Sequence, residues 1–502
     1  MNANFKRILS AVLAVLTIGS AMIMAGCSDS SDSGNTETTT AADAGETTAA
    51  ESTEPSRENT PDNLPELNFE GKTLNFFYRN TGNYTKDVVG EAGGDIVADA
   101  MYNRNLSVEE RLNIKFNLIP GDANATTYCN QLKTAVLAGD DAYDLVSAYQ
   151  AHSIPLILEG CMMNLYNAPY LDFDQPWWNI EYMEEILIGD DKLYFMIGDI
   201  ALFMFKSMSA MFFNKNIYED NIEDPAKLYE TVEAGEWVFD DFAKMTTEIY
   251  KDANGNGTSD RGDLFGFTGH TSKTTEHFMY DAGIRASERD SDGIPKIVLN
   301  NEKTIRYFEK FYSLYFENKG AFIVSGGNDI GDIQEPMFTG NEVLFLPGWI
   351  YMAENFRDME ADYGIIPYPK YDENQDEYLS LVHDGTTIYC IPATCTKLDM
   401  TAAAAEALAA EAYRTVTPAF YEVALKNKYS RDDASSRIID IIYNAATTDF
   451  LYANNYSMNN TRIGLFSRAM VSAKSKDFAS EYAKIETAAQ AALDALVKLY
   501  TK

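Results

Sequence analysis

Short apolar runs alternate with helical hydrophobic spacing in the part of the chain that follows residue 68. Residues 72–78, 114–119 and 144–149 have the length and composition of buried strands. Between them, residues 95–113 and 128–138 carry apolar side chains at helical spacing, with Asp95 as a capping residue and Gly139 as a stop signal. Strands that alternate with helices predict an α/β fold with a parallel sheet.

The ends of these predicted strands indicate where a ligand would bind. In open parallel sheets, ligands sit beyond the carboxyl ends of the strands. Polar and aromatic side chains follow the first and third predicted strands, so we expect them near a site: Arg79, Asn80, Tyr84, Tyr149 and Gln150.

Residues 193–216 form a long apolar stretch that polar pairs interrupt at Gly198-Asp199 and Lys206-Ser207. The breaks favour successive strands over a membrane helix, and Asp199 joins the candidate ligand-binding residues. Further along, the pattern predicts helices at 237–251, capped by Asp240 or Asp241, and at 301–318. It also predicts strands at 342–349, 363–366 and 386–391, an alanine-rich helix at 400–416 and a closing helix at 476–500.

The first residues have the layout of a secretory signal peptide. Lys6 and Arg7 precede an apolar run over 8–24, and Met24-Ala25-Gly26-Cys27 resembles a bacterial lipobox. This predicts a signal peptide over 1–26, lipidation of Cys27 by palmitate-type acyl chains, and attachment to the outer face of the cell membrane. The alternatives are an ordinary cleaved signal peptide and a retained span, for which the run is short and rich in small residues.

Residues 28–65 are rich in Ser, Thr, Ala, Glu and Asp, contain no aromatic residue and have Arg57 as their one basic residue. Such a segment cannot bury enough apolar surface to fold, so residues 27–68 are predicted to be a disordered linker after the lipidated cysteine. A flexible chain of this length spans roughly 35 Å.

Composition narrows the functional classes. The 502 residues suffice for two or three domains, and 46% of them are hydrophobic, which allows a large core. The net charge of −36 argues against nucleic acid as a partner, because phosphates need a basic surface. The 31 tyrosines, 27 phenylalanines and four tryptophans supply flat faces that suit sugar rings as well as a core.

Apart from Cys27, the chain has four cysteines: Cys129, Cys161, Cys390 and Cys395. Two disulfides would fit an extracellular protein, with Cys390 and Cys395 close enough in sequence to bridge a turn at Pro392. Free buried thiols fit equally well. The sequence has no Cys-x-x-Cys pair, which leaves a zinc ribbon or thioredoxin-type site unsupported.

Residues 252–263 match the pattern of a calcium-binding loop. Oxygen-bearing side chains stand at positions 1, 3, 5 and 9, Gly257 stands at position 6 and an acid at position 12. We expect a structural Ca²⁺ site of modest affinity, because position 12 is the shorter Asp rather than Glu. The alternative is a metal-free Asn-Gly turn. The expected ligands are Asp252, Asn254, Asn256, the carbonyl of Thr258, Asp260 and Asp263.

Tryptophans add further candidates for a sugar site. Trp177 and Trp178 are adjacent after Pro176, and Trp349 follows Pro347-Gly348 at a predicted strand end. Sugar C–H faces pack on such rings, so Trp177, Trp178 and Trp349 are candidate ligand-binding residues, with core packing as the alternative for each.

Several motifs, in their order along the chain, resemble those of the extracellular solute-binding proteins of ABC transporters, the maltose-binding-protein-like group. They are Asp-Lys-Leu-Tyr at 191–194, Ala-Met-Phe-Phe-Asn-Lys-Asn-Ile-Tyr at 210–218, Gly-Glu-Trp-Val-Phe-Asp-Asp-Phe at 235–242, Phe-Thr-Gly-Asn-Glu-Val-Leu-Phe at 338–345 and Tyr-Gly-Ile-Ile-Pro-Tyr-Pro-Lys at 363–370. At position 191 an Asp replaces the family's Gly.

The resemblance implies a two-lobed, periplasmic-binding-protein-like α/β fold with a hinge and a ligand cleft between the lobes. Lobe 1 would comprise residues 69–191 with about 385–449, and lobe 2 about 192–384 with 450–502. It further implies a monomeric, non-enzymatic protein without a catalytic cofactor, which captures a carbohydrate, as an oligosaccharide, by lobe closure and delivers it to ABC permease subunits.

Two other classes of function stay open on the sequence. A surface-anchored glycoside hydrolase would need a pair of carboxylates at one bond, and 76 acidic residues leave room for one. A calcium-dependent glycan-binding adhesin is the second alternative, and the absence of internal repeats disfavours it. The four histidines show no metal-binding spacing, and no Gly-x-Ser-x-Gly or phosphate-binding loop motif is present. Peptides and polyamines remain alternative ligands.

Overall fold

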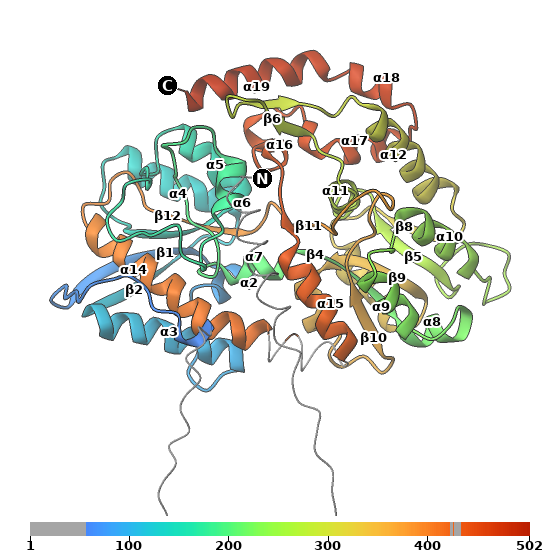
Figure 1. Ribbon diagram of the computed structural model, residues 1–502, viewed down its shortest axis with the longest axis horizontal. Helices are drawn as coiled ribbons and strands as arrows, with labels where there is room; N and C mark the ends of the chain where they lie inside the picture. Colours follow the sequence, from blue (N-terminus) through green and yellow to red (C-terminus); the bar gives the residue numbers. More distant parts are fainter. Residues whose placement is uncertain (1–56, 422–424, 426–432, 502) are drawn as a thin grey trace, which may run out of the picture. The chain divides into compact units, whose positions relative to one another are not determined.

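The computed structural model describes residues 57–421, 425 and 433–501 (Figure 1). The signal peptide, Cys27 and most of the linker lie outside these residues. In the described ranges, no helix combines the length and the apolar character that crossing a membrane requires. The described residues belong to one compact unit.

The first sheet has the strand order β12-β3-β1-β2. β1 (Lys72–Arg79) pairs in parallel with β2 (Ile114–Gly121) and with β3 (Leu145–Tyr149), as the sequence predicts. β12 (Thr387–Cys390), far away in sequence, adds an antiparallel edge next to β3. We call this sheet and the helices that pack on it lobe 1.

Helices of lobe 1 begin and end at recognisable signals. The Asp95 side chain accepts from the amides of Val97 and Ala98 at the start of α3 (Ile96–Leu112), which ends at a left-handed Asn113. Asn124 caps α4 (Ala125–Leu137), which begins three residues earlier than predicted. The other helices of this part are η1 (Arg57–Asn59), α2 (Gly82–Lys86), α5 (Gln150–Leu158), α6 (Ile180–Ile186), α14 (Leu398–Glu411), which contacts α3, and η5 (Ala412–Val416).

The second sheet is mixed and has the order β10-β4-β9-β5-β8. Its core is aromatic, with the rings of Phe242 and Phe345 5.4 Å apart between α10 and the sheet. We call this sheet and its helices lobe 2. Its strands are β4 (Ser209–Asn214), β5 (Phe265–His270), β8 (Ala321–Val324), β9 (Val343–Trp349) and β10 (Tyr363–Ile366); its helices are α8 (Lys215–Asn221), α9 (Ala226–Glu233), α10 (Phe239–Ile249), α11 (Thr275–Asp281), α12 (Glu302–Tyr312), η2 (Ser313–Glu317), η3 (Ile330–Gln334), α13 (Glu335–Thr339) and η4 (Ile350–Asn355), and a small hairpin joins β6 (Ser287–Arg289) to β7 (Pro295–Ile297).

Two details of lobe 2 differ from the sequence predictions. α10 begins after Val238 without a side-chain cap, so Asp240 and Asp241 lie in its first turn rather than capping it. In the first turn, their negative charges interact favourably with the positive end of the helix dipole. The predicted helix over 301–318 is α-helical to Tyr312 and continues as the wider π-helix η2.

The segment between the two sheets differs in part from the successive strands that its sequence predicts. Residues 202–206 form α7 (Leu202–Lys206), and β4 is the strand of the segment. Met196 pairs with Tyr389 of lobe 1 through an isolated bridge, whereas Met208 pairs with Val382 just before β4 enters lobe 2. The short β11 (Ser380–Leu381) runs beside the same crossing and pairs in parallel with β13 (Ala446–Thr447).

The C-terminal part packs against both lobes. α15 (Asp433–Asn444) contacts β10 and α9 of lobe 2, whereas η7 (Asn455–Ser457) contacts α5 of lobe 1. The predicted single closing helix is broken in two near Ile485. The remaining helices are α16 (Phe450–Ala453), η8 (Ile463–Leu465), α17 (Phe466–Ala473), α18 (Phe478–Ala483) and α19 (Glu486–Tyr500).

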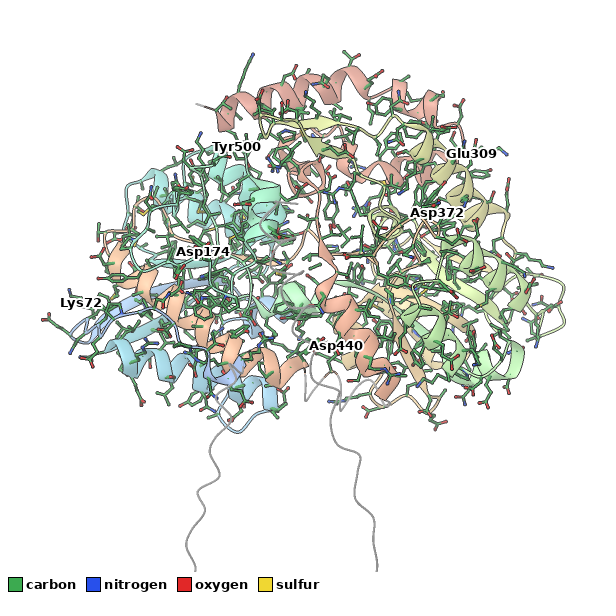
Figure 2. The ribbon with its side chains drawn as sticks, in the orientation of Figure 1. Lys72, Asp174, Glu309, Asp372, Asp440 and Tyr500 are labelled. Atoms are coloured by element: carbon green, nitrogen blue, oxygen red, sulfur yellow. The ribbon has the colours of Figure 1, made fainter. Side chains whose placement is uncertain are left out.

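Many charged side chains lie at the surface, as exposed Lys72, Asp174 and Glu309 do in Figure 2. The four cysteines of the described part are buried and free, so the alternative of two disulfides is wrong. Cys395 instead lies with its sulfur 3.6 Å from the hydroxyl of Thr401.

Candidate functional site

A cavity of about 480 Å³ opens at the carboxyl ends of the strands of lobe 1. β1 ends at Arg79 and β3 at Tyr149, and α4 begins just after β2. Parallel pairing brings these three strand ends to one edge, so the loops that follow form a common wall. The cavity is lined by Arg79, Thr81, Gly82, Asn83, Tyr84, Asn124, Ala125, Thr126, Tyr149, His152 and Phe203.

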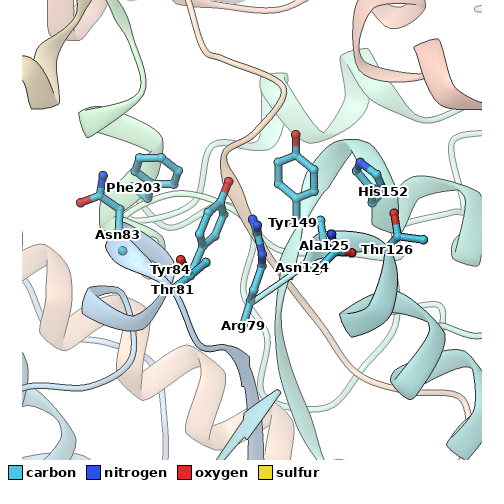
Figure 3. A pocket seen from close by; sticks show the side chains of 11 residues that line it. Arg79, Thr81, Asn83, Tyr84, Asn124, Ala125, Thr126, Tyr149, His152 and Phe203 are labelled. Carbon is cyan, nitrogen blue, oxygen red and sulfur yellow. The ribbon is translucent and has the colours of Figure 1, made fainter. Parts of the chain in front are cut away.

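Arg79 rises between two tyrosines in the middle of this cavity (Figure 3). Its guanidinium carbon lies 4.5 Å from the ring centroid of Tyr84 and 5.2 Å from that of Tyr149. Its Nε donates to the carbonyl of Ala123 at 2.8 Å, which fixes the direction of the side chain. The cation therefore lies over both rings, which stand perpendicular to each other at 89°.

Tyr84 connects lobe 1 to the returning segment before β12. Its hydroxyl donates to the carbonyl of Gly385 at 2.5 Å, and its ring meets Phe203 of α7 edge-on at 5.1 Å. Burial raises the pKa of Tyr84 well above its ordinary value, so the hydroxyl stays protonated and remains a donor.

Aromatic side chains extend this wall towards lobe 2. The ring of Phe203 lies 6.3 Å from that of Tyr351, which stacks on Trp349 at 5.7 Å and 7°. Trp349 is buried, and its Nε1 donates to Nε2 of His277 at 2.8 Å. We call Tyr149, Tyr84, Phe203, Tyr351 and Trp349 the aromatic row.

His152 and Tyr456 form the opposite flank of Tyr149. The His152 ring lies 4.9 Å from Tyr149 and 4.5 Å from Tyr456, whose side chain is 53% exposed although it is large and aromatic. Burial lowers the pKa of His152, which keeps the imidazole neutral near neutral pH.

Asp384 places a carboxylate in the segment between the lobes. Its backbone amide donates to the hydroxyl of Tyr452, and its carbonyl accepts from the amide of Ala151. These two bonds connect it to α16 and to α5. The carboxylate lies 3.4 Å from Nδ1 of His383. Its charge contributes to the raised pKa values of Tyr84 and Tyr149, after the larger effect of burial. Asp384 is buried and is not among the residues that line the cavity.

The structure places the predicted site residues in different surroundings. Arg79, Tyr84 and Tyr149 line the cavity, and Trp349 ends the aromatic row. Asn80 is exposed, and its side chain accepts from Thr85 outside the lining residues.

Four other candidates are buried elsewhere. Trp177 and Trp178 both donate their indole N–H groups to the carboxylate of Glu406 at 3.0 Å, inside lobe 1. Gln150 is fully buried and accepts from the hydroxyl of Tyr182, and Asp199 pairs with Arg57.

The candidates named from the sequence do not include Phe203, Tyr351, His152 or Asp384. Phe203 and Tyr351 have no distinguishing signal, because each stands in a run of apolar residues. Asp384 stands shortly before the β12 strand, where its position at a crossing between the lobes emerges only from the pairing of distant strands.

The loop over 252–263 brings its oxygen-bearing side chains together on the surface of lobe 2. Both carboxylate oxygens of Asp252 accept from the loop, from the amides of Gly255 and Gly257 at 2.7 and 2.9 Å. The side-chain amides of Asn254 and Asn256 donate to Asp260 at 2.8 and 3.0 Å. Their side-chain oxygens accept from the backbone amides of Asn256 and Thr258 at 3.0 and 2.7 Å. The loop thus supplies the oxygen-bearing residue types that Ca²⁺ takes, but these side chains hydrogen-bond within the loop.

No protein-family model and no curated protein sequence matches the chain. Solved structures do resemble it over most of its length. The GacH receptor of Streptomyces glaucescens, described with acarbose, has a TM-score of 0.54 at 15% identity and covers 86% of this chain and 99% of its own. UgpB from Mycobacterium tuberculosis, solved with glycerophosphocholine, has a TM-score of 0.57 at 12% identity, with 85% and 99% covered.

A third similar structure is the maltose/maltodextrin-binding domain from Bdellovibrio bacteriovorus bound to maltotriose. Its TM-score is 0.51 at 14% identity, with 85% of this chain and 100% of that one covered. These likenesses show that the chain has the two-lobed α/β fold of the maltose-binding-protein-like solute-binding proteins of ABC transporters.

Proposed function

We propose that this chain is the extracellular substrate-binding component of an ABC importer and that it captures a carbohydrate. The observation that carries this proposal is the cavity at the strand ends of lobe 1, where tyrosine rings stand beside amide and hydroxyl side chains. Rings stack on the C–H faces of sugars, and amides bind their hydroxyls. The bound maltotriose of one structurally similar protein is consistent with this use of the fold.

The length of the aromatic row supports an oligosaccharide rather than a single sugar. Neighbouring ring centroids in the row lie between 5.1 and 6.3 Å apart, and the row runs from Tyr149 in lobe 1 to Trp349 in lobe 2. Phe203 and Trp349 are buried, whereas Tyr149, Tyr84 and Tyr351 are partly exposed. The row therefore offers stacking positions for successive sugar units.

Lobe closure is the proposed mechanism of capture, without any bond made or broken. The chain crosses between the lobes at residues 202–208 and 381–386, and both crossings border the aromatic row. A ligand that contacts Tyr149 in lobe 1 and Tyr351 in lobe 2 gains contacts as the lobes approach, and this difference in binding shifts the population towards the closed form. The closed form would be the one that the permease subunits recognise.

The test is thermal unfolding of the full chain with a panel of mono- and oligosaccharides, together with recovery of each sugar. A ligand at about 100 times its dissociation constant stabilises the folded state by about 2.7 kcal/mol. We expect a shift for one sugar class, recovery of that sugar intact, and a decrease in the radius of gyration by small-angle scattering. Cleavage of the sugar would replace this proposal by the glycoside hydrolase.

Two further outcomes would change the ligand or the kind of protein. A shift with peptides or polyamines but with no sugar would retain a solute-binding protein and change its substrate. The calcium-dependent adhesin would be favoured if the protein binds immobilised glycans but does not become more compact with a soluble glycan fragment.

The proposed location follows from the first residues. We infer that Cys27 carries the lipid anchor, so that the monomeric binding protein stays at the outer face of the membrane near its permease. Replacement of Cys27 by Ser should move the protein from the membrane fraction to the medium. An unchanged membrane fraction would contradict the anchor.

We also propose a structural Ca²⁺ in the loop over 252–263, held by Asp252, Asn254, Asn256, the Thr258 carbonyl, Asp260 and Asp263. Hard oxygen ligands of this kind suit Ca²⁺. The loop contributes no residue to the cavity lining, so the ion would stabilise lobe 2 rather than bind the sugar.

A further inference from the structure

Arg79 is a cation without a counter-charge at the centre of the cavity. Among the described residues, no carboxylate lies within 4.0 Å of its guanidinium, and the residues that line the cavity include no Asp or Glu. Most other arginines of the described part have such partners, as Arg111 has in Asp62 and Arg468 in Glu276. Arg104 has none either, but it is buried and donates to the Asn105 side chain rather than lining a cavity. In a chain with 76 acidic and 40 basic residues, this absence needs an explanation.

The geometry keeps the guanidinium available to a ligand. Nε is used by the carbonyl of Ala123, and the faces of Tyr84 and Tyr149 lie against the planar group. The rings also remove water from its faces, which strengthens its interaction with an anion. The Tyr84 side chain also forms a hydrogen bond with Arg79. The N–H groups that neither Ala123 nor Tyr84 uses can bind a carboxylate or sulfate.

Neutral donors surround this cation on the same wall. Asn83, Asn124 and Thr126 line the cavity, and the Asn124 amide oxygen is already used by the backbone N–H of Thr127. Its NH₂ group is therefore free to face a ligand. These residues add hydrogen-bond donors around the guanidinium without adding a negative charge.

We infer that Arg79 binds an anionic substituent of the captured saccharide, so that the transported class is acidic sugars bearing a carboxylate or a sulfate. This inference rests on the proposed function as a saccharide-binding protein and names its substrate class. Asp384 is buried and lies outside the residues that line the cavity, whereas Arg79 lines it. Arg79 therefore supplies the charge that the cavity presents to the anionic group of the ligand.

The test measures the affinity of the full chain for matched pairs of saccharides by calorimetry. The pairs are galacturonate and galactose oligomers of equal length, and an unsaturated glucuronate disaccharide with and without sulfate, which separates the two anions. We expect the acidic member of one pair to bind at least about ten-fold more tightly, the size of one charge-assisted hydrogen bond. We also expect its affinity to fall between about 50 mM and about 300 mM salt.

Arg79→Gln should abolish the preference for the acidic member and its salt dependence, while the affinity for the neutral member changes little. Arg79→Lys should restore part of the preference, because it keeps the charge and loses the planar guanidinium. Arg306→Gln is the matched control, since Arg306 is an exposed arginine on α12, paired with Glu302 outside the cavity. Should Arg79→Gln fail to fold, the acidic-to-neutral ratio and salt response of the unaltered chain still decide the question.

Equal affinity for the acidic and neutral members, with Arg79→Gln weakening neither selectively, would overturn this inference. If a neutral saccharide nevertheless binds and compacts the chain, the proposed function stands without it. If no saccharide of either kind binds, both fail together. Binding of inorganic sulfate with the same affinity as the sulfated sugar would reduce the site to a simple anion site and would also overturn the inference.

Discussion

The guanidinium of Arg57 forms an ion pair with the carboxylate of Asp199, which joins the first described residues of the chain to the segment between the two sheets. The Asp199 side chain is 5% exposed and that of Arg57 29%. Arg57 also donates to the carbonyl of Tyr413 at 2.7 Å and lies over its ring at 4.1 Å. Thus the end of the predicted linker is docked on the protein, through Arg57 and through Asp62, which pairs with Arg111 and Arg414.

Loss of Arg57 should destabilise the protein more than loss of Asp199. Arg57→Gln leaves a buried carboxylate without its partner, which costs about 3 kcal/mol. Asp199→Asn should cost less, because the more exposed Arg57 can turn to water. The double variant should regain part of the loss of Arg57→Gln. Urea unfolding at about pH 7 measures all three free energies of unfolding.

The free energy of unfolding that Arg57→Gln loses should also depend on pH. Burial raises the pKa of Asp199, and Arg57 offsets part of that effect. Without Arg57 the folded-state pKa rises further above the unfolded value. A raised carboxyl pKa contributes stability at low pH that is lost as the pH rises, so the cost of Arg57→Gln should grow from about pH 5 to about pH 8. A cost that is independent of pH would contradict this account.

Glu406 is predicted to stabilise lobe 1 through the two indoles. Its carboxylate accepts from Trp177, Trp178 and the amide of Asp172 at 3.0 to 3.2 Å. Glu406→Ala leaves these buried donors unsatisfied and should cost at least about 3 kcal/mol in urea unfolding. The exposed Glu486→Gln on α19 is the control and should change little. Near-equal losses of stability in Glu406→Ala and Glu486→Gln would show that the two indoles find other acceptors.

The pH dependence of this site has a definite sign. Burial raises the pKa of Glu406 to about 7, and its hydrogen bonds offset part of the shift. The contribution of this carboxyl to stability is therefore fully present below its unfolded value and lost as the pH rises through about 7. Glu406→Gln does not titrate and keeps one acceptor. Its deficit relative to the unaltered chain should be larger at about pH 5 than at about pH 8.

Much of the fold can be predicted because local signals and the final structure agree. The runs that form β1, β2 and β3 are apolar enough to be buried, and Asp95 caps α3 as its position indicates. The alanine-rich helix α14 is buried nearly throughout, which its composition allows. For residues 202–206 the predicted strand is wrong, because an apolar run that is buried on all sides has the same composition as helix or strand.

The candidate site can be predicted only in part, for a physical reason. Arg79, Tyr84 and Tyr149 follow strand ends, and the rule for parallel sheets depends on local sequence alone. Trp177 and Trp178 have the composition of stacking residues, but their partner is Glu406, 228 residues away from Trp178. Contacts of such separation leave no local pattern, and neither does the pairing of Asp199 with Arg57.

Calcium is predicted to stabilise the loop of residues 252–263. Addition of Ca²⁺ should raise the unfolding temperature, with a dissociation constant of about 10⁻⁴ M, because three carboxylates and a short position 12 make a modest site. Terbium should show emission sensitised by Tyr250, whose hydroxyl lies 3.2 Å from the Asp263 carboxylate. Asp252→Asn should weaken both effects, and Asp240→Asn on α10 should not.

An unchanged unfolding temperature in EDTA and in excess Ca²⁺ would contradict the metal site. Chelation should leave saccharide affinity unchanged, since the loop lies outside the cavity lining. A loss of saccharide affinity in EDTA would instead favour the calcium-dependent adhesin.

The aromatic row yields the most direct prediction for binding. Tyr149→Ala removes a ring from the cavity wall and should lower saccharide affinity by about ten-fold, corresponding to about 1.4 kcal/mol of lost stacking. Tyr84→Phe keeps its ring and loses the hydrogen bond to the carbonyl of Gly385. It should therefore reduce the compaction of the protein on saccharide binding more than it reduces saccharide affinity. Tyr102→Ala, at an exposed tyrosine of α3, is the matched control. Calorimetry and small-angle scattering with the saccharide that shifts the unfolding transition measure both effects, and an equal loss in Tyr149→Ala and Tyr102→Ala would place the ligand outside this cavity.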